Sequence, residues 1–162
     1  MTRPATDRVR ESMFNLIASR MSFDGIHVLD LFCGTGALGL ESISRGAESA
    51  IFVETHRTVI GVARQNAERI GVSDQCSFYR RDAFKFVSSA SGRFDLVFAD
   101  PPYEIKRLTE LPSIVVPSLR PDGLFLLEHD RRYNFKETDD WVESRAYGRT
   151  IVSIFRPTEK DQ

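Results

Sequence analysis

Short apolar runs alternate with segments of helical pattern along most of the chain. Residues 26–31 (IHVLDL) predict a strand that leads into the glycine-rich segment CGTGALG, and residues 39–45 predict the helix that follows. Strands that alternate with helices in this way favour a parallel sheet with helices on both faces. The other predicted strands are 50–54, 76–80, 94–100 and 123–130, and the other predicted helices are 57–70, 83–89 and 106–118.

The two ends of the chain depart from this alternation. Residues 7–20 carry apolar side chains at helical spacing, which predicts an amphipathic helix before the first strand. Near the other end, the β-rich runs WVESRAY and TIVSIFR are separated by little more than Gly148 and Arg149, which predicts a hairpin. We therefore expect an α/β fold with a seven-stranded, mostly parallel sheet that ends in an antiparallel hairpin.

Length and composition limit the class of protein. The chain has 162 residues, of which 41% are hydrophobic and 28% charged, so we expect residues 1–162 to form a single domain. The formal net charge of −1 does not indicate a polyanionic partner, and nucleic-acid binding must be argued locally. No apolar run reaches the roughly 18 residues of a membrane span, the first residues are too polar for a signal peptide, and the cysteines and histidines lack metal-ligand spacing. These features predict a cytoplasmic protein without a metal, and we expect a monomer.

The glycine-rich segment is the first candidate for ligand binding. Residues 34–39 fit the pattern G-x-G-x-x-G between a predicted strand and a predicted helix, where glycines let a nucleotide approach the backbone. Glu54 lies twenty residues after Gly34, where a carboxylate can accept hydrogen bonds from ribose hydroxyls. The simpler alternative is a set of turn glycines beside a surface glutamate. The loop alone leaves open whether NAD or S-adenosylmethionine is the ligand.

Asp30 favours the second ligand. It lies inside an apolar strand just before the glycine loop, so its carboxylate is expected beside the ligand. A carboxylate there suits the ammonium and sulfonium of S-adenosylmethionine, whereas it would repel a pyrophosphate. A structural role for Asp30 as a hydrogen-bonding carboxylate remains the alternative.

Residues 100–103 (DPPY) follow the fourth predicted strand, at the edge where open α/β sheets bind ligands. Prolines fix the turn and donate no amide hydrogen, so a planar amine would meet only acceptors, from Asp100 and a carbonyl around Pro101. Tyr103 offers a ring on which an extruded base can stack. A strand-ending acid before a rigid proline turn is the alternative.

These segments resemble a known family. DLFCGTGALGLE resembles the S-adenosylmethionine motif of Rossmann-like class I methyltransferases, and DPPY resembles the motif of enzymes that methylate amino groups of bases or glutamine. RPATDRVRESMFNLI together with LDLFCGTGALGLESISRGA resembles the RsmD family, bacterial 16S rRNA guanine-N2 methyltransferases, over roughly residues 3–130. Family members carry a hairpin rich in Gly and Arg before this first segment. This chain begins two residues before the segment, so we expect that hairpin to be absent.

The resemblance implies roles for individual residues. The family pattern places Asp30, Gly34 and Gly36, with Phe32, at the methionine part of the cofactor, Glu54 at the ribose, and Asp82 with Ala83 at the adenine. It implies that residues 1–20 cover the cofactor and face the RNA. The residues implied as catalytic are Asp100, Pro101, Pro102 and Tyr103, with Asp100 also near the cofactor, and those implied for RNA contact are Arg3, Thr6, Arg8 and Arg10.

The leading hypothesis is therefore an S-adenosylmethionine-dependent enzyme that methylates a guanine N2 amino group in 16S rRNA of the small ribosomal subunit. Other amino-group methyltransferases, acting on adenine N6 of DNA or RNA or on protein glutamine, remain possible because the motif recognises an amino group. A less favoured alternative is an NAD(P)-dependent oxidoreductase. A binding module that keeps the fold without turnover is a third.

Overall fold

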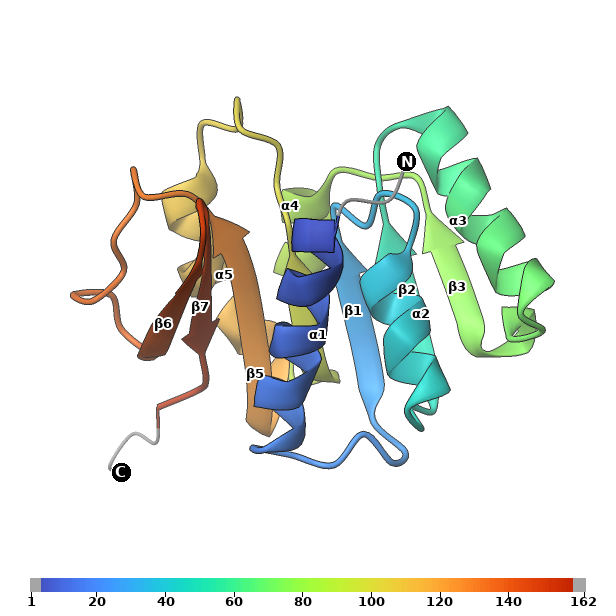
Figure 1. The fold of residues 1–162 in the computed structure, drawn as a ribbon, viewed down its shortest axis with the longest axis horizontal. Coiled ribbons are helices and arrows are strands. Elements are labelled where there is room, and N and C mark those ends of the chain that lie inside the picture. Colours follow the sequence, from blue (N-terminus) through green and yellow to red (C-terminus); the bar gives the residue numbers. More distant parts are fainter. Residues whose placement is uncertain (1–3, 159–162) are drawn as a thin grey trace.

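The computed structural model describes residues 4–158 of the chain, and the side chains of residues 7–158. Helices and strands alternate through β5, and a hairpin follows (Figure 1). The strands are β1 (His27–Leu31), β2 (Ser49–Val53), β3 (Cys76–Tyr79), β4 (Phe94–Ala99), β5 (Leu119–His129), β6 (Trp141–Tyr147) and β7 (Thr150–Phe155). The helices are α1 (Pro4–Ala18), α2 (Ala37–Ser44), α3 (Arg57–Arg69), α4 (Ala83–Ser88) and α5 (Leu111–Val115).

The seven strands form one sheet in the order β3-β2-β1-β4-β5-β7-β6. Neighbours from β3 to β5 are parallel, and β7 is antiparallel to both β5 and β6. The predicted mixed sheet with an antiparallel hairpin at its end is confirmed. The chain runs outward from β1 to β3 and then resumes on the other side of β1 with β4, so the order reverses between β1 and β4. Open α/β sheets bind ligands at this reversal, beyond the carboxyl ends of the strands.

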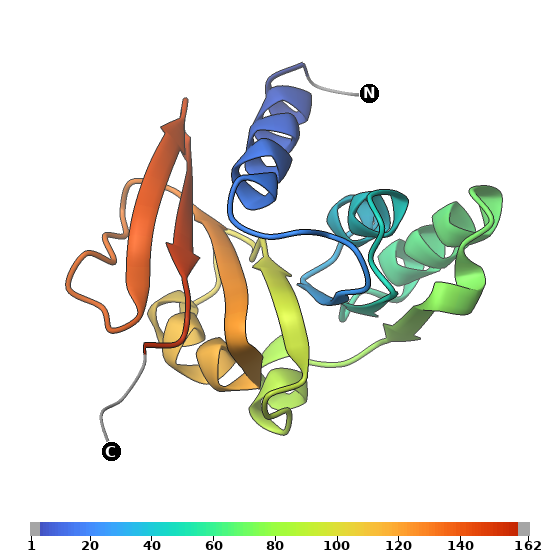
Figure 2. The ribbon, with the colours of Figure 1, turned by 90° about the horizontal axis from the view of Figure 1, so that it is seen from below.

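Helices cover both faces of the sheet. Turning the molecule shows α1, α2 and α3 on one face and α4 and α5 on the other (Figure 2). Each face has its own apolar core. Phe14, Ile17 and Phe52 lie in the core beneath α1 to α3, and Phe84, Leu111 and Phe125 lie in the core beneath α4 and α5. Among the described residues, no helix combines the length and the apolar character that crossing a membrane requires.

The predicted helix over residues 106–118 is wrong as a single element. The segment consists of a 3₁₀ turn at Leu108–Glu110, the short helix α5, and a second 3₁₀ turn at Val116–Ser118. Pro112 is tolerated in the first turn of α5, but Pro117 cannot donate the amide hydrogen that a continuing helix needs, so the helix ends before it.

The strand predicted over residues 123–130 starts earlier than expected. β5 begins at Leu119, and its register against β4 shifts between Phe94 and Leu96. This irregularity accommodates Pro121, which would interrupt a regular ladder.

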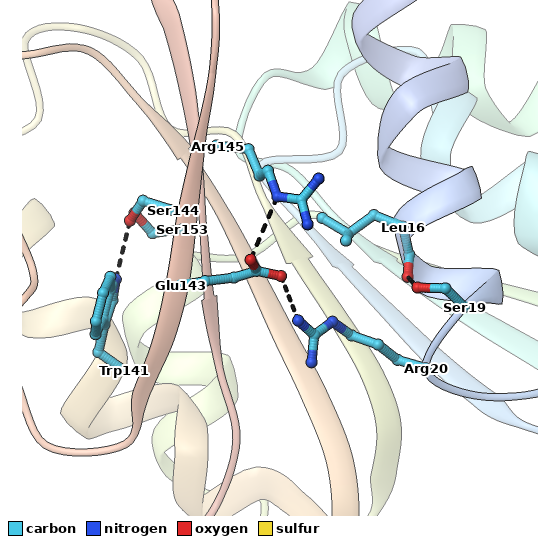
Figure 3. A network of polar contacts seen from close by, with 8 residues as sticks. All are labelled: Leu16, Ser19, Arg20, Trp141, Glu143, Ser144, Arg145 and Ser153. Atoms are coloured by element: carbon cyan, nitrogen blue, oxygen red, sulfur yellow. Dashed lines mark hydrogen bonds and ion pairs between the residues drawn. The ribbon is translucent and has the colours of Figure 1, made fainter.

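The end of α1 is tied to the hairpin by ion pairs. Arg20, just after α1, pairs with Glu143 of β6, and Glu143 also accepts a hydrogen bond from Nε of Arg145 at 3.3 Å (Figure 3). The side chains of Arg20 and Glu143 are each only 25% exposed, so this contact is shielded from solvent. The pairing connects the end of α1 to β6 at the edge of the sheet.

A chain of hydrogen bonds crosses the hairpin to the end of β5. Nε1 of Trp141 donates to Oγ of Ser144 at 2.9 Å, and Oγ of Ser144 lies 2.7 Å from Oγ of Ser153 on β7 (Figure 3). Oγ of Ser153 lies in turn 2.6 Å from Nε2 of His129. These bonds fix the carboxyl end of β5, which borders the candidate site.

Candidate active site

The loop between β1 and α2 contains three residues with positive φ, a backbone conformation that is rare for residues other than glycine. Phe32, Gly34 and Gly36 have φ values of 55°, 57° and 85°, and Gly36 caps α2 in the left-handed region. Glycine adopts this region without strain, whereas the positive φ of Phe32 is unusual for a residue with a side chain. The amide of Gly34 donates to Oε1 of Glu54 at 3.1 Å, so the end of β2 holds the loop in place.

Gly39 lets α2 pack directly against the sheet. A Cβ added there would lie 2.4 Å from Cε2 of Phe52, well inside van der Waals contact. The amide of Gly39 donates to Oδ2 of Asp30 at 2.9 Å. The third glycine of the motif thus serves packing, and its amide orients the buried carboxyl of Asp30.

Three carboxyl groups gather at the carboxyl ends of neighbouring strands. Asp30 on β1 pairs with Phe98 of β4, and Asp100 comes two residues later on the same face of that strand. Ala99 of β4 pairs with Leu127 of β5, so the next residues along the two strands, Asp100 and Glu128, lie beside each other. Because side chains alternate along a strand, all three point to the face that α1 and α2 cover.

Burial raises the pKa of all three acids, and neighbouring carboxylates raise the pKa of Asp30 and of Glu128 further. Burial raises the pKa of Asp30 to about 8, and the charges of Asp100 and Glu54 add to the rise against the hydrogen bond from Gly39. Burial likewise raises the pKa of Glu128 to about 8, with further contributions from Asp100 and Asp30. Asp100 is exposed to the pockets, but the surrounding protein partly desolvates its carboxyl and raises its pKa to about 6. Among residues 7–158, no basic side chain offsets these shifts, and no acid or His/Cys cluster could hold a metal ion.

Two pockets meet at this edge. The larger pocket has a volume of about 950 Å³ and lies between α1, the ends of β1, β4 and β5, and the turn of the β6–β7 hairpin. The smaller pocket, of about 600 Å³, lies beyond the ends of β2 and β4. Both are lined by Phe32, Gly34, Asp100 and Pro102. A ligand that occupies both would therefore pass beside Asp100.

The residues predicted for a cofactor divide between the two pockets. Asp30 lines the larger pocket, whereas Glu54, Asp82 and Ala83 line the smaller one. Oε2 of Glu54 accepts the amide of His56 at 3.0 Å, and Oδ2 of Asp82 accepts the amide of Lys85 at 3.0 Å as the N-cap of α4. Gly36 is buried behind the loop, where an added Cβ would meet Ala63 at 3.2 Å, and it lines neither pocket.

The segment Asp100–Tyr103 forms a rigid turn between the pockets. The carbonyl of Pro102 accepts the amide of Ile105 at 3.2 Å, while among the described residues no hydrogen bond reaches the carbonyl of Pro101. Tyr103 is 73% exposed at the mouth of the larger pocket. Its carbonyl accepts a hydrogen bond from Arg132 at 3.4 Å, and the Arg132 guanidinium lies 5.9 Å from the centre of its ring.

The residues predicted to contact RNA do not all lie at the pockets. Arg10 lines the larger pocket and pairs with Asp7 at 3.1 Å, whereas Arg8 is exposed on α1 and lines neither pocket. Thr6 belongs to α1, but its side chain, like all of Arg3, lies outside the described residues.

Sequence reasoning missed several residues of the larger pocket. Glu128 repeats the signal that singled out Asp30 and Asp100, an acid at the carboxyl end of an apolar strand, and could have been found in the same way. Arg132 and Tyr133 lie in an irregular segment without periodicity. Tyr147 and Arg149 reach the pocket only because the hairpin folds back over it.

Comparisons with known proteins agree with this architecture. The sequence profile described as conserved hypothetical protein 95 matches residues 1–156. A Bacillus subtilis protein named "Putative rRNA methyltransferase YlbH" is 39% identical over 96% of this chain and 88% of its own length. The Haemophilus influenzae protein named ribosomal RNA small subunit methyltransferase D is 28% identical over 93% of this chain and 80% of its own.

A solved structure gives the same result. The structure described as "Putative methyltransferase yhhF from Escherichia coli" superimposes with a TM-score of 0.83 at 26% identity, covering 98% of this chain and 89% of that one. Profile, relatives and structure thus agree over almost the whole length of the chain. The chain belongs to the family described as conserved hypothetical protein 95, the RsmD family that its sequence resembles.

Proposed function

We propose that this chain is an S-adenosylmethionine-dependent methyltransferase that methylates the N2 amino group of a guanine in 16S rRNA of the small ribosomal subunit. The relatives named above carry the rRNA part of this proposal. The observation that carries the chemistry is the position of Asp100 to Tyr103 where the two pockets meet.

The acidic side chains of the site fit a cationic cofactor. Burial raises the pKa of Asp30, Asp100 and Glu128, and repulsion by neighbouring carboxylates raises the pKa of Asp30 and Glu128 further. No basic side chain among residues 7–158 offsets these shifts. An ammonium or sulfonium beside them would relieve the repulsion, whereas the pyrophosphate of NAD(P) would add to it. We therefore assign the smaller pocket, with Glu54 and Asp82, to the adenosine and the neighbourhood of Asp30 to the methionine part.

The residues of the chain orient the amino group of the target base. S-adenosylmethionine, when bound, supplies an electrophilic methyl group on a sulfonium. Asp100 and the carbonyl of Pro101 accept the two hydrogens of the amino group, which directs the nitrogen lone pair out of the base plane. Methylation would make the nitrogen acidic, and Asp100 would accept the proton that the nitrogen loses. The raised pKa of Asp100, about 6, makes its carboxylate a stronger base than an aspartate with the ordinary pKa.

Tyr103 and Arg132 are suited to hold the base. The tyrosine ring is exposed at the pocket mouth, and Arg132 lies near both its ring and the ring of Tyr133, 5.4 Å from the centre of the latter. Stacking on an aromatic side chain contributes roughly 1–3 kcal/mol per base. A base turned out of the RNA can therefore be retained beside Asp100 without a sequence-specific groove.

The test is methyl transfer from labelled S-adenosylmethionine to 30S subunits that lack N2-methylguanine. We expect label in N2-methylguanine of 16S rRNA with the unaltered chain and loss of label with Asp100→Asn. The exposed Asp122→Asn of β5 is the matched control and should retain activity. Label in adenine or in protein would contradict the substrate, and bound cofactor without any transfer would contradict the catalytic assignment.

A further inference from the structure

Glu128 is a half-buried acid of the larger pocket to which the mechanism above assigns no contact with the target base. We propose that Glu128 determines base specificity by accepting the N1–H of the target guanine next to the amino group held by Asp100. This inference rests on the proposed function and explains how that site distinguishes guanine from other amines.

The strand register places Glu128 beside Asp100. Ala99 and Leu127 are paired across β4 and β5, and the next residues along both strands are these two acids. Both side chains line the larger pocket. Neighbouring parallel strands lie about 4.8 Å apart, so the two side chains can turn toward each other and bring their carboxyl oxygens to adjacent hydrogen-bonding groups on the edge of a base.

Glu128 also lacks an internal partner. The amide of Gly39 occupies one oxygen of Asp30, but no hydrogen bond from residues 7–158 reaches the carboxyl of Glu128. The side chain is half-buried and lines the larger pocket, so its acceptor oxygens are available to a ligand that enters there. The described residues contain no cluster that could hold a metal ion, and a donor from a base that enters the pocket can reach this carboxyl.

Guanine offers the matching donors. Its N2 amino group is followed along the Watson–Crick edge by N1–H, so two neighbouring acceptors can bind two neighbouring donors. In adenine the amino group is flanked by the acceptors N1 and N7, and in glutamine by the amide oxygen. An ionised carboxylate at Glu128 would repel either acceptor.

The charge state of Glu128 is compatible with this role. Burial and the charges of Asp100 and Asp30 raise the pKa of Glu128 to about 8 in the ligand-free protein. A cationic cofactor bound beside Asp30 lowers the pKa of all three acids, and an N1–H donor stabilises the ionised form of Glu128 further. In the loaded enzyme the glutamate therefore acts as an acceptor.

The experiment compares two target bases in one RNA. A 16S rRNA fragment that the unaltered chain methylates is prepared with guanine or with 2-aminopurine at the target; 2-aminopurine keeps the amino group but has an acceptor at N1. We expect kcat/KM to favour guanine by roughly 10- to 100-fold with the unaltered chain. Glu128→Gln should reduce this preference to about threefold or less, because its amide can donate to N1 of 2-aminopurine.

Two further variants separate specificity from folding. Glu48→Gln, an exposed glutamate before β2, should keep the full preference. Glu128→Asp keeps the charge and should retain the preference for guanine with a lower kcat/KM, so it tests the proposal if the glutamine variant does not fold or bind cofactor. Urea unfolding monitors folding in each case, and calorimetry measures cofactor affinity separately.

The possible results distinguish the two proposals. An unchanged guanine preference in Glu128→Gln, with overall activity merely lowered, would overturn the role of Glu128 and leave the proposed function intact. No transfer to guanine by the unaltered chain would overturn both. A preference lost in Glu128→Gln and kept in Glu128→Asp would establish the carboxylate as the group that reads N1–H.

Discussion

Asp30→Asn should stabilise the ligand-free protein at alkaline pH while it weakens cofactor binding. The folded state raises the pKa of Asp30 from 3.8 to about 8, mainly through burial. The folded protein therefore binds this proton more tightly than the unfolded chain. Stability is highest at low pH and falls as the pH rises from about 4 to about 8. Asparagine carries no such charge and can still accept the amide of Gly39 through its oxygen.

The magnitude follows from the shift. A displacement of about four pH units corresponds to roughly 5 kcal/mol as an upper limit, which relaxation and water entry reduce. We expect Asp30→Asn to increase the free energy of unfolding by about 2 kcal/mol at pH 8 and by much less at pH 5. Urea unfolding at both pH values, with Asp122→Asn as the exposed control, measures this difference.

Cofactor affinity completes the test. If Asp30 is ionised to hold a cation, the asparagine variant should bind S-adenosylmethionine at least about tenfold more weakly in calorimetry, the loss of roughly one charged interaction. A variant that is less stable than the unaltered chain at pH 8 would refute the burial argument. A more stable variant with unchanged affinity would refute the assignment of Asp30 to the cofactor.

Three further substitutions test the residues that surround and support the site. Gly39→Ala should lower the free energy of unfolding by about 1–3 kcal/mol in urea, because its methyl group would lie 2.4 Å from the Phe52 ring; an unchanged value would mean that α2 moves freely. Arg20→Ala leaves Glu143 with Arg145 alone and should lower the free energy of unfolding by about 1–2 kcal/mol, with faster amide hydrogen exchange in α1 than in α2. Equal exchange rates in the two helices would contradict a stabilising contact between Arg20 and Glu143. Arg149→Ala should weaken RNA binding and reduce its salt dependence by about one counterion while cofactor affinity stays unchanged, since Arg149 lines the pocket mouth without an ion pair among the described residues.

The regular elements could be predicted because their signals are local. Alternating apolar strands and helices gave β1 to β4 and the hairpin to within a residue or two at each end. The segment 106–118 failed because its apolar spacing is helical, while Pro117 removes the donor that a continuous helix requires. The start of β5 at Leu119 depends on a register shift against β4, and no pattern within β5 itself encodes it.

The candidate site could be predicted only where a residue has a fixed place relative to a strand end. Asp30 and Asp100 follow this rule, and the structure places them beside each other. Glu128 follows it too, but the apolar run before it was interpreted only as a core strand. Arg132 has no such signal, because its position over Tyr103 depends on where an irregular segment after β5 comes to lie.

The arrangement of charge also explains why the near-zero net charge gave no hint of an RNA substrate. Asp30, Asp100 and Glu128 lie at the carboxyl ends of the strands, while Arg132 and Arg149 line the same pocket from the segment after β5 and the hairpin turn. These opposite charges cancel in the sum over the chain but act on different parts of a bound complex. Acids at the strand ends suit a cationic methyl donor and the hydrogen-bond donors of guanine, and arginines around them suit the phosphates on either side of an extruded nucleotide. Polyanion recognition can therefore coexist with a net charge of −1, because it depends on where the charges lie and not on their total.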